Sequence, residues 1–152
     1  MVRGKYATTD SEIAIATGMR RYILAEELGT TLPIDHSPAN MELLIYNDTD
    51  VPVGCGYVGL NDDFDFVIGG IAILPAYRNQ KYGTFLVKIL IDKALMSHAP
   101  CIYLDALKGT EGFFETLGFT ISSPNYDKQG TTFTPMQLDP STMHKCCCHE
   151  NS

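Results

Sequence analysis

Four polar side chains stand together in one short turn of the sequence. They are Arg78, Asn79, Gln80 and Lys81. The turn follows Pro75 and leads into a run with helical spacing. The first N–H groups of a helix have no partner inside the helix, and the helix dipole favours negative charge there. With Arg78 and Lys81 beside such groups, the turn predicts a binding site for phosphate or pyrophosphate.

The elements on either side of this turn must position it. Residues 66–74 are almost continuously apolar, which is typical of a strand buried on both faces. Pro75 cannot donate to a strand ladder and should end that strand. In residues 82–96, Thr84, Lys88 and Asp92 form a polar stripe with apolar residues around it, which predicts a helix.

Three carboxylates are candidates for proton transfer. Glu26 and Glu27 lie near the end of a predicted first helix, residues 11–29, which Asp10 or Ser11 could cap. Either glutamate could act as a general base through water, or form a solvated helix end. Asp105 ends a predicted strand and could face a cleft or stabilise a turn.

Other reactive side chains have simpler interpretations. Tyr103 is interpreted as core packing, Tyr126 as a turn residue, and Cys101 as an inert thiol. Residues 144–150 read HKCCCHE. The His and Cys side chains of residues 144–149 are possible soft metal ligands. Consecutive cysteines point in different directions, so this tail could bind zinc or copper(I), or be an ordinary polar terminus.

The remaining sequence predicts a mixed β-sheet flanked by helices. A short helix is expected at residues 110–117. Further strands are expected at residues 41–46, 53–60, 101–106, 119–122 and 132–138. This order predicts an α/β fold. We expect a single domain over residues 1–138 and a Cys/His-rich tail over residues 139–152.

Bulk properties exclude several classes of protein. The net charge of −7 argues against a nucleic-acid partner, because phosphate contacts need clustered Lys and Arg. No apolar run is long enough to span a bilayer, and the N-terminus lacks the apolar core of a signal peptide. We therefore expect a soluble, cytoplasmic protein without a membrane partner.

Two stretches together resemble the GNAT superfamily, the GCN5-related N-acetyltransferases. ILPAYRNQKYGTFLV is similar to the family's acyl-CoA motif, R/Q-x-x-G-x-G/A at a helix start, with Arg78 and Gly83 at its first and last positions. EGFFETLGF, residues 111–119, is similar to the family's FY-x-x-x-GF segment. The N-terminal RRYILAEELG also resembles a pattern of one bacterial subgroup.

The resemblance implies a GNAT acyl-CoA N-acyltransferase fold with acetyl-CoA as cosubstrate. Direct attack by a primary amine of a small molecule or peptide is implied, with Glu27 preferred as the base from its place in the subgroup pattern. A homodimer is consistent with the family. The implied cofactor-binding residues are Ile71, Ala72, Ile73, Arg78, Asn79, Gln80, Lys81, Tyr82, Gly83, Thr84, Phe113 and Phe114.

Two residues depart from the family pattern. Lys81 stands where the family has its first motif glycine, which lets the backbone approach phosphate closely. Phe114 stands where many members have a tyrosine that protonates the leaving thiolate. These departures leave open a slow or non-catalytic module that binds acyl-CoA. The tail leaves open a metal-responsive protein.

Overall fold

The strands form one mixed sheet. The computed structural model describes residues 2–23, 25, 40–128 and 130–141. The eight strands have the order β1-β2-β3-β4-β5-β8-β6, and β7 pairs with β8. The strands are β1 (Arg3–Tyr6), β2 (Met41–Tyr46), β3 (Pro52–Leu60), β4 (Phe66–Ile73), β5 (Ile102–Leu107), β6 (Thr120–Ile121), β7 (Tyr126–Lys128) and β8 (Thr131–Leu138). The helices are α1 (Asp10–Ile23), η2 (Pro75–Tyr77), α2 (Tyr82–Met96) and α3 (Glu111–Glu115).

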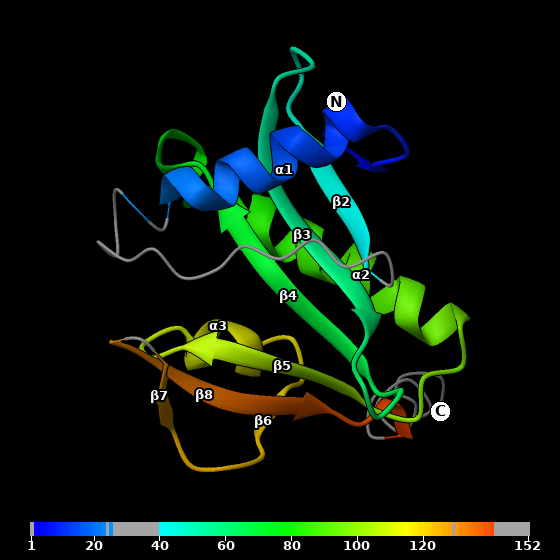
Figure 1. Cartoon of the computed structure of the whole chain (residues 1–152), viewed down its shortest axis with the longest axis vertical. Helices are drawn as coiled ribbons and strands as arrows, with labels where there is room; N and C mark the ends of the chain where they lie inside the picture. The colour runs from blue at the N-terminus through cyan, green and yellow to red at the C-terminus, as the bar shows by residue number, and fades with distance from the viewer. Residues whose placement is uncertain (1, 24, 26–39, 129, 142–152) are drawn as a thin grey trace, which may run out of the picture.

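Helices cover both faces of the sheet, but unevenly. In Figure 1, α1 crosses in front of β2, β3 and β4, and α2 and α3 lie behind the sheet. The larger core packs β-sheet residues such as Leu43 and Ile68 with Leu86 and Leu90 of α2 and Phe114 of α3. In the part of the chain that the structure describes, no helix covers β5 and β8 on the α1 side.

The sheet opens between its two central strands. Within the described residues, β4 and β5 pair only at Phe66 with Ile102 and at Val67 with Tyr103. Beyond these pairs the strands separate toward their C-terminal ends (Figure 1). The register between β3 and β4 also shifts near this point, and Gly70 has a φ of +61°. A bulge bends its strand, so this one carries β4 away from β5.

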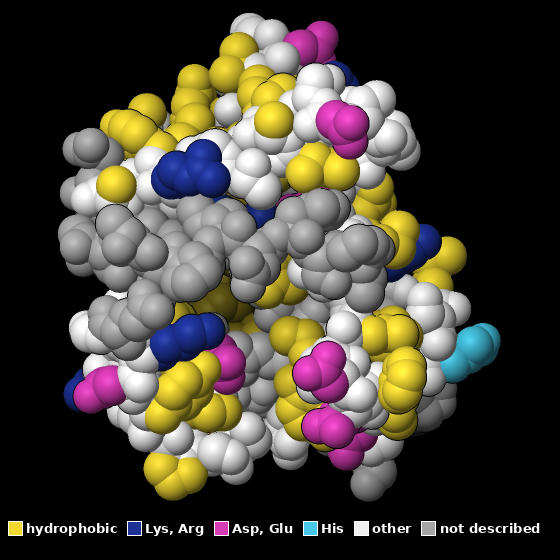
Figure 2. Space-filling view, viewed as in Figure 1, with side chains coloured by type: hydrophobic (Ala, Val, Ile, Leu, Met, Phe, Trp, Pro, Cys, Tyr) yellow, Lys and Arg dark blue, Asp and Glu magenta, His cyan; other side chains and the backbone are white. Residues whose placement is uncertain are grey.

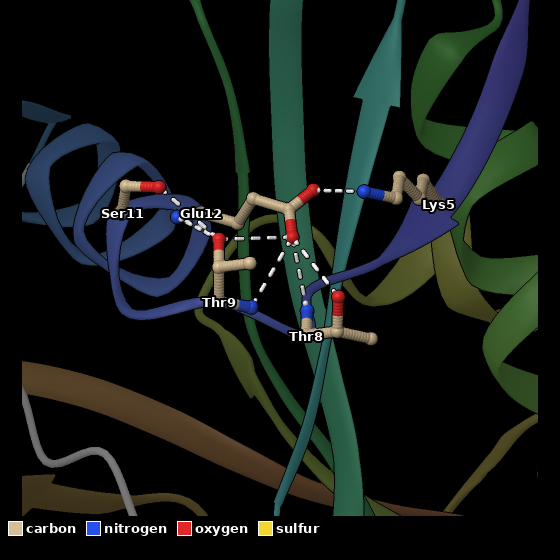
Figure 3. A network of polar contacts seen from close by, with 5 residues as sticks. All are labelled: Lys5, Thr8, Thr9, Ser11 and Glu12. Carbon is tan, nitrogen blue, oxygen red and sulfur yellow. Dashed lines mark hydrogen bonds and ion pairs between the residues drawn. The ribbon is translucent and has the colours of Figure 1, made fainter.

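A network of polar contacts fixes the start of α1 (Figure 3). The Glu12 carboxylate accepts hydrogen bonds from the backbone N–H groups of Thr8 at 3.1 Å and Thr9 at 3.2 Å. The Glu12 N–H donates to the Thr9 hydroxyl oxygen at 3.2 Å, which completes a capping box. Lys5 of β1 pairs with the same carboxylate. Thr9, rather than the predicted Asp10 or Ser11, therefore caps this helix.

The predicted fold class is confirmed, with two strands that the sequence patterns missed. β1 was not predicted because its RGKY sequence is exposed and lacks alternation of apolar and polar residues. β7 lies in the predicted turn region, and its three residues are held as a strand by pairing with β8. The predicted helix over residues 11–29 is helical as Asp10–Ile23, and residues 26–29 lie outside the described residues.

None of the helices in the described residues is both long enough and apolar enough to cross a membrane.

Glu12→Gln is expected to lower the thermal unfolding temperature at neutral pH and to lose that effect in acid. The Lys5 hydrogen bond, followed by the Thr8 N–H, lowers the pKa of Glu12 from 4.5 to about 2. A carboxyl whose pKa is lowered by folding stabilises the native state above its unfolded pKa, and this contribution disappears as pH falls through the folded pKa. Circular-dichroism melts should show the difference between wild type and variant shrinking between pH 4.5 and about 2. A difference that stays constant across this window would contradict the assignment.

Candidate functional site

The opening between β4 and β5 is a cleft of about 850 Å³. The start of α2, the turn before it and α3 complete its walls. Of the residues that the sequence predicts to bind a cofactor, the cleft brings together all except Gln80. These are Ile71, Ala72, Ile73, Arg78, Asn79, Lys81, Tyr82, Gly83, Thr84, Phe113 and Phe114. Gln80 instead points back along the turn, where its amide donates to the Ala76 carbonyl at 3.5 Å.

The turn before α2 is built from two left-handed residues. Asn79 has a φ of 62° and Lys81 a φ of 68°. Lys81 is the N-cap of α2, and its carbonyl accepts the first helical hydrogen bond from the Phe85 N–H at 3.1 Å. The family pattern has glycine where Lys81 stands, and the left-handed φ gives the physical reason for that preference.

The start of α2 presents free backbone donors to the cleft. Among the described side chains, none caps this helix. The N–H groups of Tyr82, Gly83 and Thr84 precede the first helical hydrogen bond, and all three residues line the cleft. The Arg78 Nε donates to the Ile73 carbonyl at 3.0 Å, which ties the turn to the end of β4. Free N–H groups, a helix dipole and the Lys81 ammonium together favour an anion here.

The opposite part of the cleft is apolar. Its wall includes Ile68 and Ile71 of β4, the two phenylalanines of α3, and Phe133 of β8. The rings of Phe113 and Phe114 pack edge to face with centroids 5.0 Å apart. Phe114 is 7% exposed and also packs against Phe119, with centroids 6.1 Å apart. It is therefore a buried part of the wall with no proton to donate.

A second cavity of about 410 Å³ adjoins the cleft on the face that no helix covers. The two cavities share Leu104 and Asp105. Two carboxylates, Asp65 and Asp105, line the second cavity, and its lining contains no Lys or Arg among the described residues. Figure 2 shows Asp and Glu side chains over the lower half of this face, where β5 and β8 lie.

Asp105 is held in place from the neighbouring hairpin. The Tyr126 hydroxyl donates to its Oδ2 at 2.6 Å. Burial, followed by this hydrogen bond, raises the pKa of Tyr126 to about 12. The phenol therefore stays protonated near neutral pH and keeps its hydrogen bond to Asp105. Tyr126, interpreted from sequence as a turn residue, lies in β7 and has this contact.

Cysteines do not contribute a nucleophile to the described site. Cys55 is fully buried under α1, and burial raises the pKa of its thiol to about 11. The Cys101 thiol donates to the Leu138 carbonyl at 3.3 Å. Among the described residues that line the cleft, none is Cys, Ser or His.

Several predicted features lie outside the described residues. They include Glu26, the preferred base Glu27, and the tail with His144, Cys146, Cys147, Cys148 and His149. Over residues 2–23, 25, 40–128 and 130–141, no group of three His, Cys, Asp or Glu side chains could hold a metal ion. The base and the tail stay predictions.

Sequence reasoning missed a buried ion pair next to the cleft. Arg20 lines the cleft and pairs with Glu42 of β2, and the two residues are 7% and 2% exposed. Burial opposes the charge, but the hydrogen bond and charge of Glu42 raise the pKa of Arg20 above its ordinary value. The sequence does contain a signal, because Glu42 interrupts the apolar strand MELLIY and Arg20 falls on the apolar stripe of α1.

The sequence matches the model of one known protein family. A family model described as an acetyltransferase (GNAT) domain matches residues 9–140. No curated protein is significantly similar to the sequence.

Solved structures with the same fold are numerous. ElaA of Escherichia coli superposes with a TM-score of 0.79 at 20% identity, over 91% of this chain and 100% of that one. An acyl-CoA N-acyltransferase from Pseudomonas aeruginosa gives 0.75 at 16% identity, over 91% and 99%. N-acetylglutamate synthase from Neisseria gonorrhoeae, in complex with coenzyme A and N-acetyl-glutamate, gives 0.71 at 18% identity, over 91% and 35%. At these identities the comparison shows the fold, as the sequence predicted.

Lys81→Gly is expected to stabilise the protein by about 1 kcal/mol, because glycine adopts the left-handed conformation without the steric cost of a Cβ. The gain should appear as a higher midpoint in urea or thermal unfolding. Gln80→Gly is the matched control, since Gln80 is not among the described residues with positive φ. Glycine there adds unfolded-state entropy and should lower the midpoint. A Lys81→Gly variant no more stable than wild type would contradict the role assigned to this backbone angle.

Proposed function

This chain belongs to the GNAT acetyltransferase family, and we propose that it transfers acetyl from acetyl-CoA to a primary amine of a small molecule or peptide. Family and fold together support acyl transfer. The observation that carries the finer proposal is the cleft between β4 and β5, which leads directly into the uncapped start of α2.

The residues of the cleft fit the parts of a CoA thioester. The free N–H groups at the start of α2, with Lys81 beside them, would hold the pyrophosphate. Beyond Val67, β4 has no pairing with β5, so its backbone groups on that edge can bond the amides of the pantetheine. The apolar wall with Phe113 would exclude water from the thioester end.

The second cavity suits the amine. Most free amines are protonated near neutral pH, and Asp65 and Asp105 attract a cation. Asp105 lines both cavities and accepts a hydrogen bond from Tyr126, which supports a role for its carboxylate beside both substrates. Asp105 and the sequence candidate Glu27 are thus the groups that could accept a proton from the amine, directly or through water.

The reaction needs no enzyme nucleophile. The amine nitrogen attacks the thioester carbonyl, a C–N bond forms, the C–S bond breaks, and CoA leaves as a thiolate. A protonated amine must first lose one proton, because an ammonium has no lone pair for the attack. The nitrogen loses a second proton as the amide forms, and the sulfur takes one up. Phe114 cannot supply the proton for the sulfur, but a thiolate is a good leaving group and can take its proton from water.

A second candidate function is non-catalytic binding of acyl-CoA, which the buried Phe114 favours. Binding of acetyl-CoA without release of thiol across a broad panel of primary amines would support it. Prompt release would exclude it. The metal-responsive tail, the cytoplasmic location, the homodimer and the domain limit at residue 138 stay predictions.

Calorimetric titration with acetyl-CoA tests the cofactor site, and Gly83 offers a matched pair of variants. A Cβ at Gly83 would lie 3.5 Å from the Phe113 ring, an ordinary contact. Gly83→Gln and Gly83→Glu have the same size and differ in charge. Repulsion of the pyrophosphate should weaken binding at least tenfold more in Gly83→Glu than in Gly83→Gln. No binding by wild type at millimolar acetyl-CoA would end the proposal. Equal binding by both variants would show that the phosphates do not lie beside Gly83.

Asp105→Asn is expected to lower kcat/KM for the amine about tenfold or more and to leave the affinity for acetyl-CoA unchanged. The substitution removes the charge that faces the amine and keeps the shape of the side chain. Release of thiol from acetyl-CoA with the best primary amine of the panel provides the measurement. Asp127→Asn, on the same hairpin but outside both cavity linings, is the control. A kcat/KM for Asp105→Asn within twofold of wild type would rule out this role.

A further inference from the structure

One guanidinium joins α1, β2 and the bulge of β4. Arg20 Nη1 donates to Glu42 Oε2 at 3.2 Å, and Nη2 donates to Oε1 of the same carboxylate. Arg20 Nε donates to the Gly70 carbonyl oxygen at 2.6 Å. The guanidinium carbon also lies 5.3 Å from the centroid of the Tyr57 ring. A buried arginine is thus held in a fixed orientation by a carboxylate and in turn holds one backbone carbonyl.

Glycine at position 70 of the bulge allows the close contact with Arg20. Gly70 has a φ of +61°, where residues with a Cβ are strained. A Cβ at Gly70 would lie 2.4 Å from Arg20 Nε and 2.8 Å from Tyr57 Cδ2. The backbone of β4 therefore approaches the guanidinium as closely as it does because position 70 is glycine.

The direction of the Gly70 carbonyl sets the direction of the next N–H. A trans peptide is planar, so its C=O and N–H groups point to opposite sides, and the described residues contain no cis peptide. The Leu74 N–H donates to the Val53 carbonyl of β3, at 2.9 Å. Because residues of a strand alternate between its two edges, Ile73 and Ile71 direct their N–H groups to the other edge, where β5 has separated.

We infer that Arg20, oriented by Glu42, is a positioning residue that fixes the Gly70–Ile71 peptide so that the Ile71 N–H faces the acyl carbonyl in the cleft. This inference rests on the proposed function, because an N–H group aimed at a thioester carbonyl stabilises the negative charge that develops on its oxygen during attack. Without the guanidinium, the Gly70 carbonyl would keep only the weak contact from the Cys55 thiol at 3.9 Å, and the peptide of the bulge would be held less firmly.

The test uses the full chain and the double variant Arg20→Met/Glu42→Leu, which removes both charges and leaves neither one buried alone. CoA, which has no acyl carbonyl, should bind within twofold of wild type. With acetyl-CoA and a saturating amine, kcat should fall about tenfold to a hundredfold, because the donor is displaced rather than deleted. Infrared difference spectra of bound acetyl-CoA labelled with ¹³C at the thioester carbonyl should show a lowered stretching frequency in wild type and a smaller shift in the variant.

Two controls separate positioning from general stability. Arg21→Met removes an exposed arginine from the same helix and should leave kcat and the carbonyl band unchanged. Leu44→Ala destabilises the same small core under α1 without touching Arg20 hydrogen bonds, and should leave the band unchanged. If the double variant does not fold, Arg20→Lys keeps the charge opposite Glu42 but loses the fork of donors, and its kcat and band should be intermediate.

The outcomes are distinct. A folded double variant, or Arg20→Lys in its place, with the kcat and carbonyl band of wild type would overturn this inference and leave the proposed function standing. A wild-type chain that binds acetyl-CoA without turnover would remove the catalytic proposal, and the carbonyl band would still decide the role of Arg20. A wild-type chain that binds no CoA would remove both.

Discussion

The separation of β4 from β5 is the constraint on which the rest of the structure depends. The strands are in register at only two residue pairs, and beyond them each strand has backbone groups that a continuous sheet would satisfy. A buried polar group without a partner costs about 1–3 kcal/mol, so an opening of this kind needs other partners or a ligand. The structure supplies some of them. Arg20 binds the Gly70 carbonyl and Arg78 binds the Ile73 carbonyl. The edge groups that remain lie along the cleft.

A buried ion pair lies beside the cleft. Arg20 and Glu42 are both nearly inaccessible, and a buried ion pair usually contributes little net stability compared with well-packed apolar residues. Breaking it by removing one partner would cost about 3–5 kcal/mol, because the other charge would be left buried. Its value therefore lies in geometry rather than stability. Planar guanidinium donors fix two directions at once, toward Glu42 and toward β4, which an apolar cluster under α1 could not do.

The sequence predicts the elements of this fold more readily than their junctions. Helix α2 follows from its polar stripe, and strand β4 follows from its continuous apolar run. The two motifs of the resemblance meet at the cleft. β1 and β7 could not be predicted, because their residues carry no apolar alternation and become strands only through pairing with β2 and β8. Likewise the Arg20–Glu42 pair joins residues 22 positions apart, and Tyr126 meets Asp105 across 21 positions. Such contacts depend on tertiary packing rather than on local pattern.

The departures from the family pattern acquire a physical meaning in this setting. Phe114 closes the apolar wall and lies against Phe113 and Phe119, so a hydroxyl at this position would need a partner within a packed aromatic cluster. Lys81 has a left-handed φ, which is strained for a residue with a Cβ. Its side chain adds a cation at the start of α2. Compared with the family pattern, the chain thus lacks the hydroxyl of a tyrosine at position 114 and has an additional positive charge at position 81. Because thiolate departure needs little acid assistance, rate should depend mainly on how the thioester is held. Under the function proposed above, the bulge of β4 and the Arg20 hydrogen bond to it are the features expected to hold the thioester.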